Sequence, residues 1–219
     1  MRDVTEYAKF FLKKGLDSEP NTFDGNMKLQ KLLFFANFIN YAENEKLLFS
    51  EKMCAFENGT VIEEVRQKYK NDYNSFKQDA MRFDPDFSQQ EYEILNKTID
   101  IFGNLNAREL SKLNHEFNFW QKRYQASTNE NGYFNKKLSE ITTEDFDLEV
   151  DKIRQVLKIR QENQQDNQVT ELVNGVTFFY DPNEIDVDKI MPQLDFFSMN
   201  EADEESYIVS LDDGNLVIM

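Results

Sequence analysis

The chain has 219 residues, 25 basic side chains against 41 acidic ones, and a formal net charge of −16. This acidity excludes a general affinity for nucleic acid or anionic membranes, which need a basic surface, and 20 Phe with 40% hydrophobic residues exclude wholesale disorder. A single cysteine, Cys54, excludes a disulfide framework, and no apolar run resembles a signal peptide or a membrane span, so we expect a soluble cytoplasmic protein.

The first 160 residues show the periodicity of helices. Apolar side chains at positions 4, 7, 8 and 11 predict a short helix that ends near Gly15. A long helix is expected after the turn residues 24–26. Its apolar side chains, from Leu29 to Ile39, lie on nearly all sides, which predicts a central, buried helix.

Three further helices are predicted from their start signals. In each, a capping residue precedes an acidic residue by three positions, and apolar residues flank the junction. The pairs are Ser88 with Glu91, Asn106 with Glu109, and Thr142 with Asp145.

The charge changes sharply along the chain. Residues 1–160 carry 24 basic and 27 acidic side chains, whereas residues 161–219 carry only Lys189 against 14 acidic ones. The polar run 161–168 lies at this break and is typical of a linker or a solvated helix end. We therefore predict a helical domain at 1–160 and an acidic C-terminal extension at 161–219, which serves either as an interaction module or as a solubilising surface.

The extension is predicted to contain short strands. Residues 169–180, 207–211 and 216–219 are rich in β-branched, aromatic and other apolar residues, and 212–215 include an Asp-Gly turn that is typical of a β-hairpin. Residues 187–191 fit one helical turn. Because a lone hairpin is only marginally stable, we expect it to dock on the helical domain, on a second copy or on a partner.

No catalytic constellation is evident in the sequence. There is one histidine, His115, and no His/Cys cluster with zinc spacing, no glycine-rich phosphate loop and no nucleophile elbow. We therefore predict no enzyme activity, no cofactor and no metal. His115 lies five residues before the only tryptophan, Trp120, and we expect Trp120 to seal the core while His115 bonds to nearby backbone.

Three blocks of sequence carry a family resemblance. Residues 27–36 contain Met-Lys-Leu-Gln-Lys-Leu, residues 55–65 contain Ala-Phe-Glu-Asn-Gly-Thr-Val, and residues 110–120 contain a Leu-Ser pair followed by His and Trp. Together they resemble the Panacea domain, the family of SocA-like antitoxins, over about residues 4–124. Phe56 stands where the family commonly has Trp, and Thr60 where it has Pro. We expect structural roles for the motif residues Lys28, Leu29, Gln30, Lys31, Leu32, Phe56, Gly59, His115 and Trp120.

The resemblance implies a mainly α fold, to which the acidic extension adds a small α+β part. It also implies an antitoxin that neutralises a toxin by direct protein binding, often encoded in prophages. An inhibitor of a host nucleic-acid-acting defence enzyme is the alternative. In both cases we expect a protein partner with a basic surface, and homo-oligomer formation stays open. Candidate contact residues are Phe178, Phe179, Leu194, Phe196, Phe197, Glu201, Asp203, Glu204, Glu205 and Tyr207.

Direct nucleic-acid binding is a separate hypothesis. Lys13, Lys14, Lys28 and Lys31, with the basic residues at 66–70, could form a local basic patch. Acidic neighbours balance them, so solvated helix faces explain these residues better.

Overall fold

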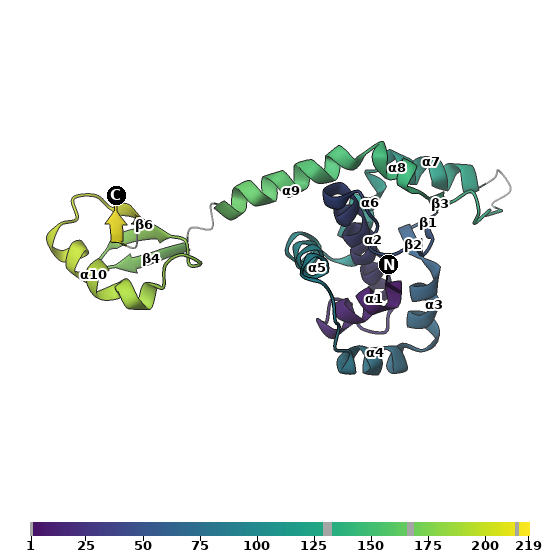
Figure 1. The fold of residues 1–219 in the computed structure, drawn as a ribbon, viewed down its shortest axis with the longest axis horizontal. Coiled ribbons are helices and arrows are strands. Elements are labelled where there is room, and N and C mark those ends of the chain that lie inside the picture. The colour runs from purple at the N-terminus through teal and green to yellow at the C-terminus, as the bar shows by residue number, and fades with distance from the viewer. Residues whose placement is uncertain (1, 129–132, 166–168, 213–214) are drawn as a thin grey trace. The chain divides into compact units, whose positions relative to one another are not determined.

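The computed structural model describes residues 2–128, 133–165, 169–212 and 215–219. The chain divides into two compact units, Met1–Val156 and Leu157–Met219. Helix α9 (Val150–Gln165) includes both this division and the position at which the charge changes. The first unit is mainly helical, as predicted, and the second contains a small sheet and a helix (Figure 1).

The first unit is built around a long central helix, α2 (Phe23–Asn44). Helices α1 (Val4–Lys13), α5 (Gln89–Phe102) and α6 (Ala107–His115) pack against it (Figure 1). The other elements are α3 (Glu63–Asn71), α4 (Tyr73–Arg82), α7 (Asn118–Ser127) and α8 (Thr143–Asp147).

Helix α2 is buried on nearly every side, as its apolar pattern predicts. Its phenylalanines are the centre of an aromatic core. Phe35 stacks on Phe102 with ring centroids 4.1 Å apart, and Phe38 stacks on Phe146 at 4.2 Å. Such pairs add to the stabilisation that burial of aromatic surface provides.

The predicted capping residues precede helices in the structure. Ser88 caps α5 and Asn106 caps α6, each in a reciprocal pair with the acid three residues on. At α8, the Thr142 backbone N–H donates to the Asp145 carboxylate at 2.8 Å. These bonds occupy backbone donors that helix starts leave free.

A small sheet in the first unit was not expected from the sequence. Strands β1 (Met53–Phe56), β2 (Gly59–Ile62) and β3 (Glu140–Ile141) form an antiparallel sheet in the order β2-β1-β3. The strands are too short for two-residue alternation to be recognised. The β1–β2 hairpin turns at Glu57 and Asn58, since Phe56 pairs with Gly59.

The second unit has a sheet and a hydrophobic core of its own. Strands β4 (Val169–Val173), β5 (Val176–Tyr180), β6 (Ser206–Asp212) and β7 (Asn215–Ile218) are arranged in this order. Strands β6 and β7 pair antiparallel, but the predicted turn residues 213–214 lie outside the described residues. The hairpin is therefore part of a four-stranded sheet. It packs on the core of the second unit, so it does not need the helical domain, a second copy or a partner to bury its apolar side chains.

The helix of the second unit is longer than the sequence predicts. Helix α10 (Val187–Asn200) extends the single helical turn predicted at 187–191, despite Pro192 inside it. It connects β5 to β6, which are parallel, with Thr177 beside Ser206. Parallel neighbours require a crossover of this length, and a helix is the usual solution.

Candidate functional site

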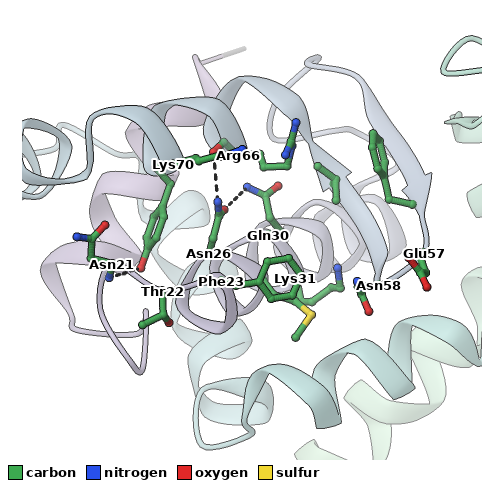
Figure 2. Close-up of a pocket in the computed structure, with 14 residues that line it drawn as sticks. Asn21, Thr22, Phe23, Asn26, Gln30, Lys31, Glu57, Asn58, Arg66 and Lys70 are labelled. Atoms are coloured by element: carbon green, nitrogen blue, oxygen red, sulfur yellow. Dashed lines mark hydrogen bonds between the residues drawn. The ribbon is translucent and has the colours of Figure 1, made fainter. Parts of the chain in front are cut away.

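A pocket of about 480 Å³ opens between the start of α2, the β1–β2 turn and α3 (Figure 2). This volume is within the range of small-molecule sites, roughly 300–1,000 Å³. Three motif residues, Gln30, Lys31 and Phe56, line it. The remaining lining residues are Asn21, Thr22, Phe23, Asn26, Met27, Glu57, Asn58, Val61, Arg66, Tyr69 and Lys70.

One wall of the pocket is a chain of amide hydrogen bonds. The Ile62 backbone N–H donates to Gln30 Oε1 at 2.7 Å, and Gln30 Nε2 donates to Asn26 Oδ1 at 3.3 Å. Asn26 Nδ2 in turn donates to the Arg66 carbonyl at 3.2 Å (Figure 2). The chain joins α2, β2 and α3, and fixes the orientation of both amide side chains.

Lys31 is a buried cation at this pocket. The residue is 1% exposed, and its Nζ donates to the Thr60 carbonyl at 3.0 Å. Among the residues that the structure describes, no carboxylate forms an ion pair with it. Burial lowers the pKa of Lys31 to about 7, because its ammonium has lost water without gaining a counter-charge.

The β1–β2 turn is fastened to helix α6 by Asn114. Its Oδ1 accepts from the Thr60 backbone N–H at 2.5 Å and from Thr60 Oγ1 at 3.0 Å. The family that this sequence resembles has proline at this position. A proline has no backbone N–H and could not donate the first of these bonds. Asn114 Nδ2 is buried and has no hydrogen-bond partner among the described residues.

His115 and Trp120 also contact the β1–β2 turn. Their rings stack with centroids 3.8 Å apart, and Trp120 Nε1 donates to the Phe56 carbonyl at 3.1 Å. Burial and the nearby Lys31 ammonium lower the pKa of His115, which also makes a hydrogen bond to the backbone of Glu57. This packing is compatible with the structural roles predicted for both residues.

The other motif residues stabilise the helical core. Leu29 and Leu32 are fully buried. Lys28 Nζ donates to Ser18 Oγ and to the Gly103 carbonyl, both at 2.8 Å, which ties α2 to the segment after α5. The motif of α2 therefore has two faces, one in the core and one at the pocket.

Several candidate contact residues of the acidic extension are unsuited to that role. Phe178 and Leu194 are fully buried in the core of the second unit, and Tyr207 is 7% exposed. The Tyr207 hydroxyl accepts from the backbone N–H groups of Asp203 and Glu204 and donates to the Asp203 carboxylate. Tyr207 thus organises the acidic loop from inside and does not present itself to a partner.

The remaining candidates lie at the surface of the second unit. Phe196 is 61% exposed on α10, and Phe197 is half-buried against the core. Phe179 is half-buried. The acidic candidates, which are all exposed, are Glu201, Asp203, Glu204 and Glu205.

The second sheet has an open face that was not predicted from the sequence. Phe178, Tyr180 and Tyr207 point from β5 and β6 into the core, so their neighbours in each strand point to the opposite face. On that face Phe179 pairs with Ile208, and Leu172 pairs with Thr177. Leu172 is 69% exposed and Ile208 44%. The signal was the alternation within 169–180, which we interpreted as a strand without assigning its faces.

Two absences apply to the part of the chain that the structure describes. It contains no group of three or more His, Cys, Asp or Glu residues that could hold a metal ion. Within the same residues, no helix is long and apolar enough to span a bilayer.

Comparison with known proteins supports the family resemblance. Residues 29–121 match the family model described as "Antitoxin SocA-like, Panacea domain". The matched residues include Gln30 and Lys31 of α2, the β1–β2 turn, and His115 with Trp120. No curated protein and no solved structure matches the chain. The match suggests an antitoxin role, for which no catalysis is needed.

Proposed function

We propose that this protein is an antitoxin that neutralises a toxin by direct binding, and that the open face of the second sheet is its contact surface. The antitoxin role is supported by the match of residues 29–121 to the SocA-like Panacea domain. The contact surface is supported by one observation: the apolar side chains of Leu172 and Ile208 are exposed on a sheet face that α10 does not cover.

The open face has the composition of a protein interface. Its centre is apolar, with Leu172, Phe179 and Ile208, and hydroxyl groups of Thr and Ser alternate with them along the strands. Interfaces typically combine such an apolar centre with a polar rim.

Acidic residues lie at both ends of this sheet. Glu201 and residues 203–205 precede β6, while Asp181, Glu184 and Asp186 follow β5. Because β5 and β6 are parallel, the start of one and the end of the other lie at opposite ends of the sheet. The partner that fits is a protein with an apolar patch between basic residues, as on enzymes that bind RNA or nucleotides.

The test is co-expression with the neighbouring open reading frame, scored by growth. The double variant Leu172→Thr, Ile208→Thr retains strand-forming residues but removes the apolar centre, so we expect neutralisation to fail. In binding measurements with the purified toxin, we expect the dissociation constant to rise roughly 10- to 100-fold.

The matched control is Phe196→Gln, Met199→Gln, which removes two exposed apolar side chains from α10, each more exposed than Ile208. Full neutralisation by the sheet variant, with loss in the α10 variant, would assign the contact to α10. A neighbouring gene that is not toxic by itself would count against the antitoxin role. It would favour the alternative, inhibition of a nucleic-acid-acting defence enzyme.

A further inference from the structure

We propose that the pocket between α2, the β1–β2 turn and α3 binds a small organic anion, whose phosphate or carboxylate pairs with Lys31 and whose planar apolar body lies along Phe23 and Phe56. This inference goes beyond the proposed function, since it concerns the first unit and does not depend on the contact surface of the second.

The first argument is the uncompensated charge of Lys31. A buried ammonium ordinarily has a carboxylate partner, because desolvation without one is costly. Lys31 has only the Thr60 carbonyl within the described residues, although its ammonium carries three donors. An anion in the pocket would supply the missing counter-charge. It would also raise the pKa of Lys31, because a nearby negative charge favours the protonated ammonium.

The second argument is the charge of the surrounding wall. Arg66 and Lys70 also line the pocket, and Glu57 is its one carboxylate among the lining residues. Arg66 is held by Glu63 through two hydrogen bonds, at 2.8 and 2.7 Å. Lys70 forms no ion pair in the described part of the chain. Two lysines are therefore free to attract an anion.

The third argument is that the pocket is already organised. The hydrogen bonds through Gln30 and Asn26 fix their amides, and each NH₂ group retains a second N–H for a ligand. Phe23, 69% exposed, and the half-buried Phe56 offer flat apolar surface to a ring. A ring that carries one anionic group fits the volume of about 480 Å³.

The test uses three probes of similar shape on the full chain: phenyl phosphate, phenylacetate and benzyl alcohol. Binding is followed by isothermal titration and by the amide resonances of Gln30, Asn58 and Thr60. We expect at least one anion to shift these resonances and to bind at least tenfold more tightly than benzyl alcohol. The stronger of the two anions identifies the anionic group as phosphate or carboxylate.

The matched variants are Lys31→Met and Lys28→Met. Both lysines are buried in α2, but Lys28 bonds to Ser18 and Gly103 and does not line the pocket. We expect Lys31→Met to weaken the anion at least tenfold, and Lys28→Met to leave its affinity within twofold. Methionine removes the charge with little change of volume, so thermal unfolding, followed by Trp120 fluorescence, should show a folded variant.

Three results would overturn the proposal. One is that no probe shifts the three resonances in the parent protein at about 10 mM, the weak end of measurable affinity. Another is equal affinity for benzyl alcohol and the anions, which would mean an apolar pocket only. The third is an unchanged affinity in a folded Lys31→Met variant. The first two tests use the parent protein, so they hold even if a variant does not fold.

Discussion

At the scale of single residues, the β1–β2 turn requires glycine at position 59, because the backbone there lies very close to two side chains. Gly59 has a φ of +96°, which favours glycine, and a Cβ there would lie 2.5 Å from Asn114 Oδ1 and 2.6 Å from Lys31 Cε. The resemblance marked Gly59, Lys31 and His115 as motif residues, but they are distant in sequence. Their convergence on one turn could not be predicted, because it depends on how α2 and α6 pack.

Gly59→Ala should therefore destabilise the first unit by two effects, the left-handed backbone and the clash. Gly15 is the matched control, since its φ is +71° and no atom lies within 4 Å of its Cβ position. We expect Gly15→Ala to lower the free energy of unfolding by about 1–2 kcal/mol. Gly59→Ala should cost roughly 1–3 kcal/mol more. Urea denaturation followed by fluorescence of Trp120 measures both, and equal losses would refute the close approach.

At the scale of elements, local signals predicted the helix starts and the strands of the second unit, but not the short strands of the first. A capping residue, the acid three positions later and the flanking apolar residues all lie within six residues, so the sequence alone contains them. The β1–β2 hairpin has four-residue strands, and β3 has two residues. Their pairing depends on tertiary contacts. Only the first turn of α10 was predicted, whereas the helix continues through Pro192 to Asn200.

The capping of α6 gives a prediction at this scale. The Asn106 side chain accepts from the N–H groups of Arg108 and Glu109, both at 3.0 Å. Asn106→Ala leaves these donors without that partner, and should lower the free energy of unfolding by about 1 kcal/mol. Asn104→Ala, at an exposed position just before the helix, should change it by less than about 0.5 kcal/mol. Urea denaturation of both variants decides, and similar effects would rule out a capping role.

At the scale of the whole molecule, the net charge of −16 belongs mostly to one part of the chain. Residues 1–160 are nearly neutral, and the acidic residues are concentrated where the second unit provides an open sheet face. The polar run at 161–168 and the change of charge predict a boundary near residue 160, and the fold divides into compact units between Val156 and Leu157. That the second part has its own core was not predicted, because it depends on the parallel pairing of β5 with β6.

Removal of residues 161–219 should leave the first unit folded. Each unit has its own core: the aromatic cluster around Phe38 lies in the first, and that around Phe178 in the second. Because Trp120 is the only tryptophan, its fluorescence reports the first unit alone. We expect truncation to change the free energy of unfolding of the first unit, measured by urea denaturation, by less than about 0.5 kcal/mol. Neutralisation of the toxin should be lost, because the proposed contact surface is gone.

Two outcomes of the truncation would contradict these expectations. A truncated chain that unfolds at a much lower urea concentration would show that the first unit requires the second for its stability. A truncated chain that still neutralises the toxin would place the contact surface on the first unit.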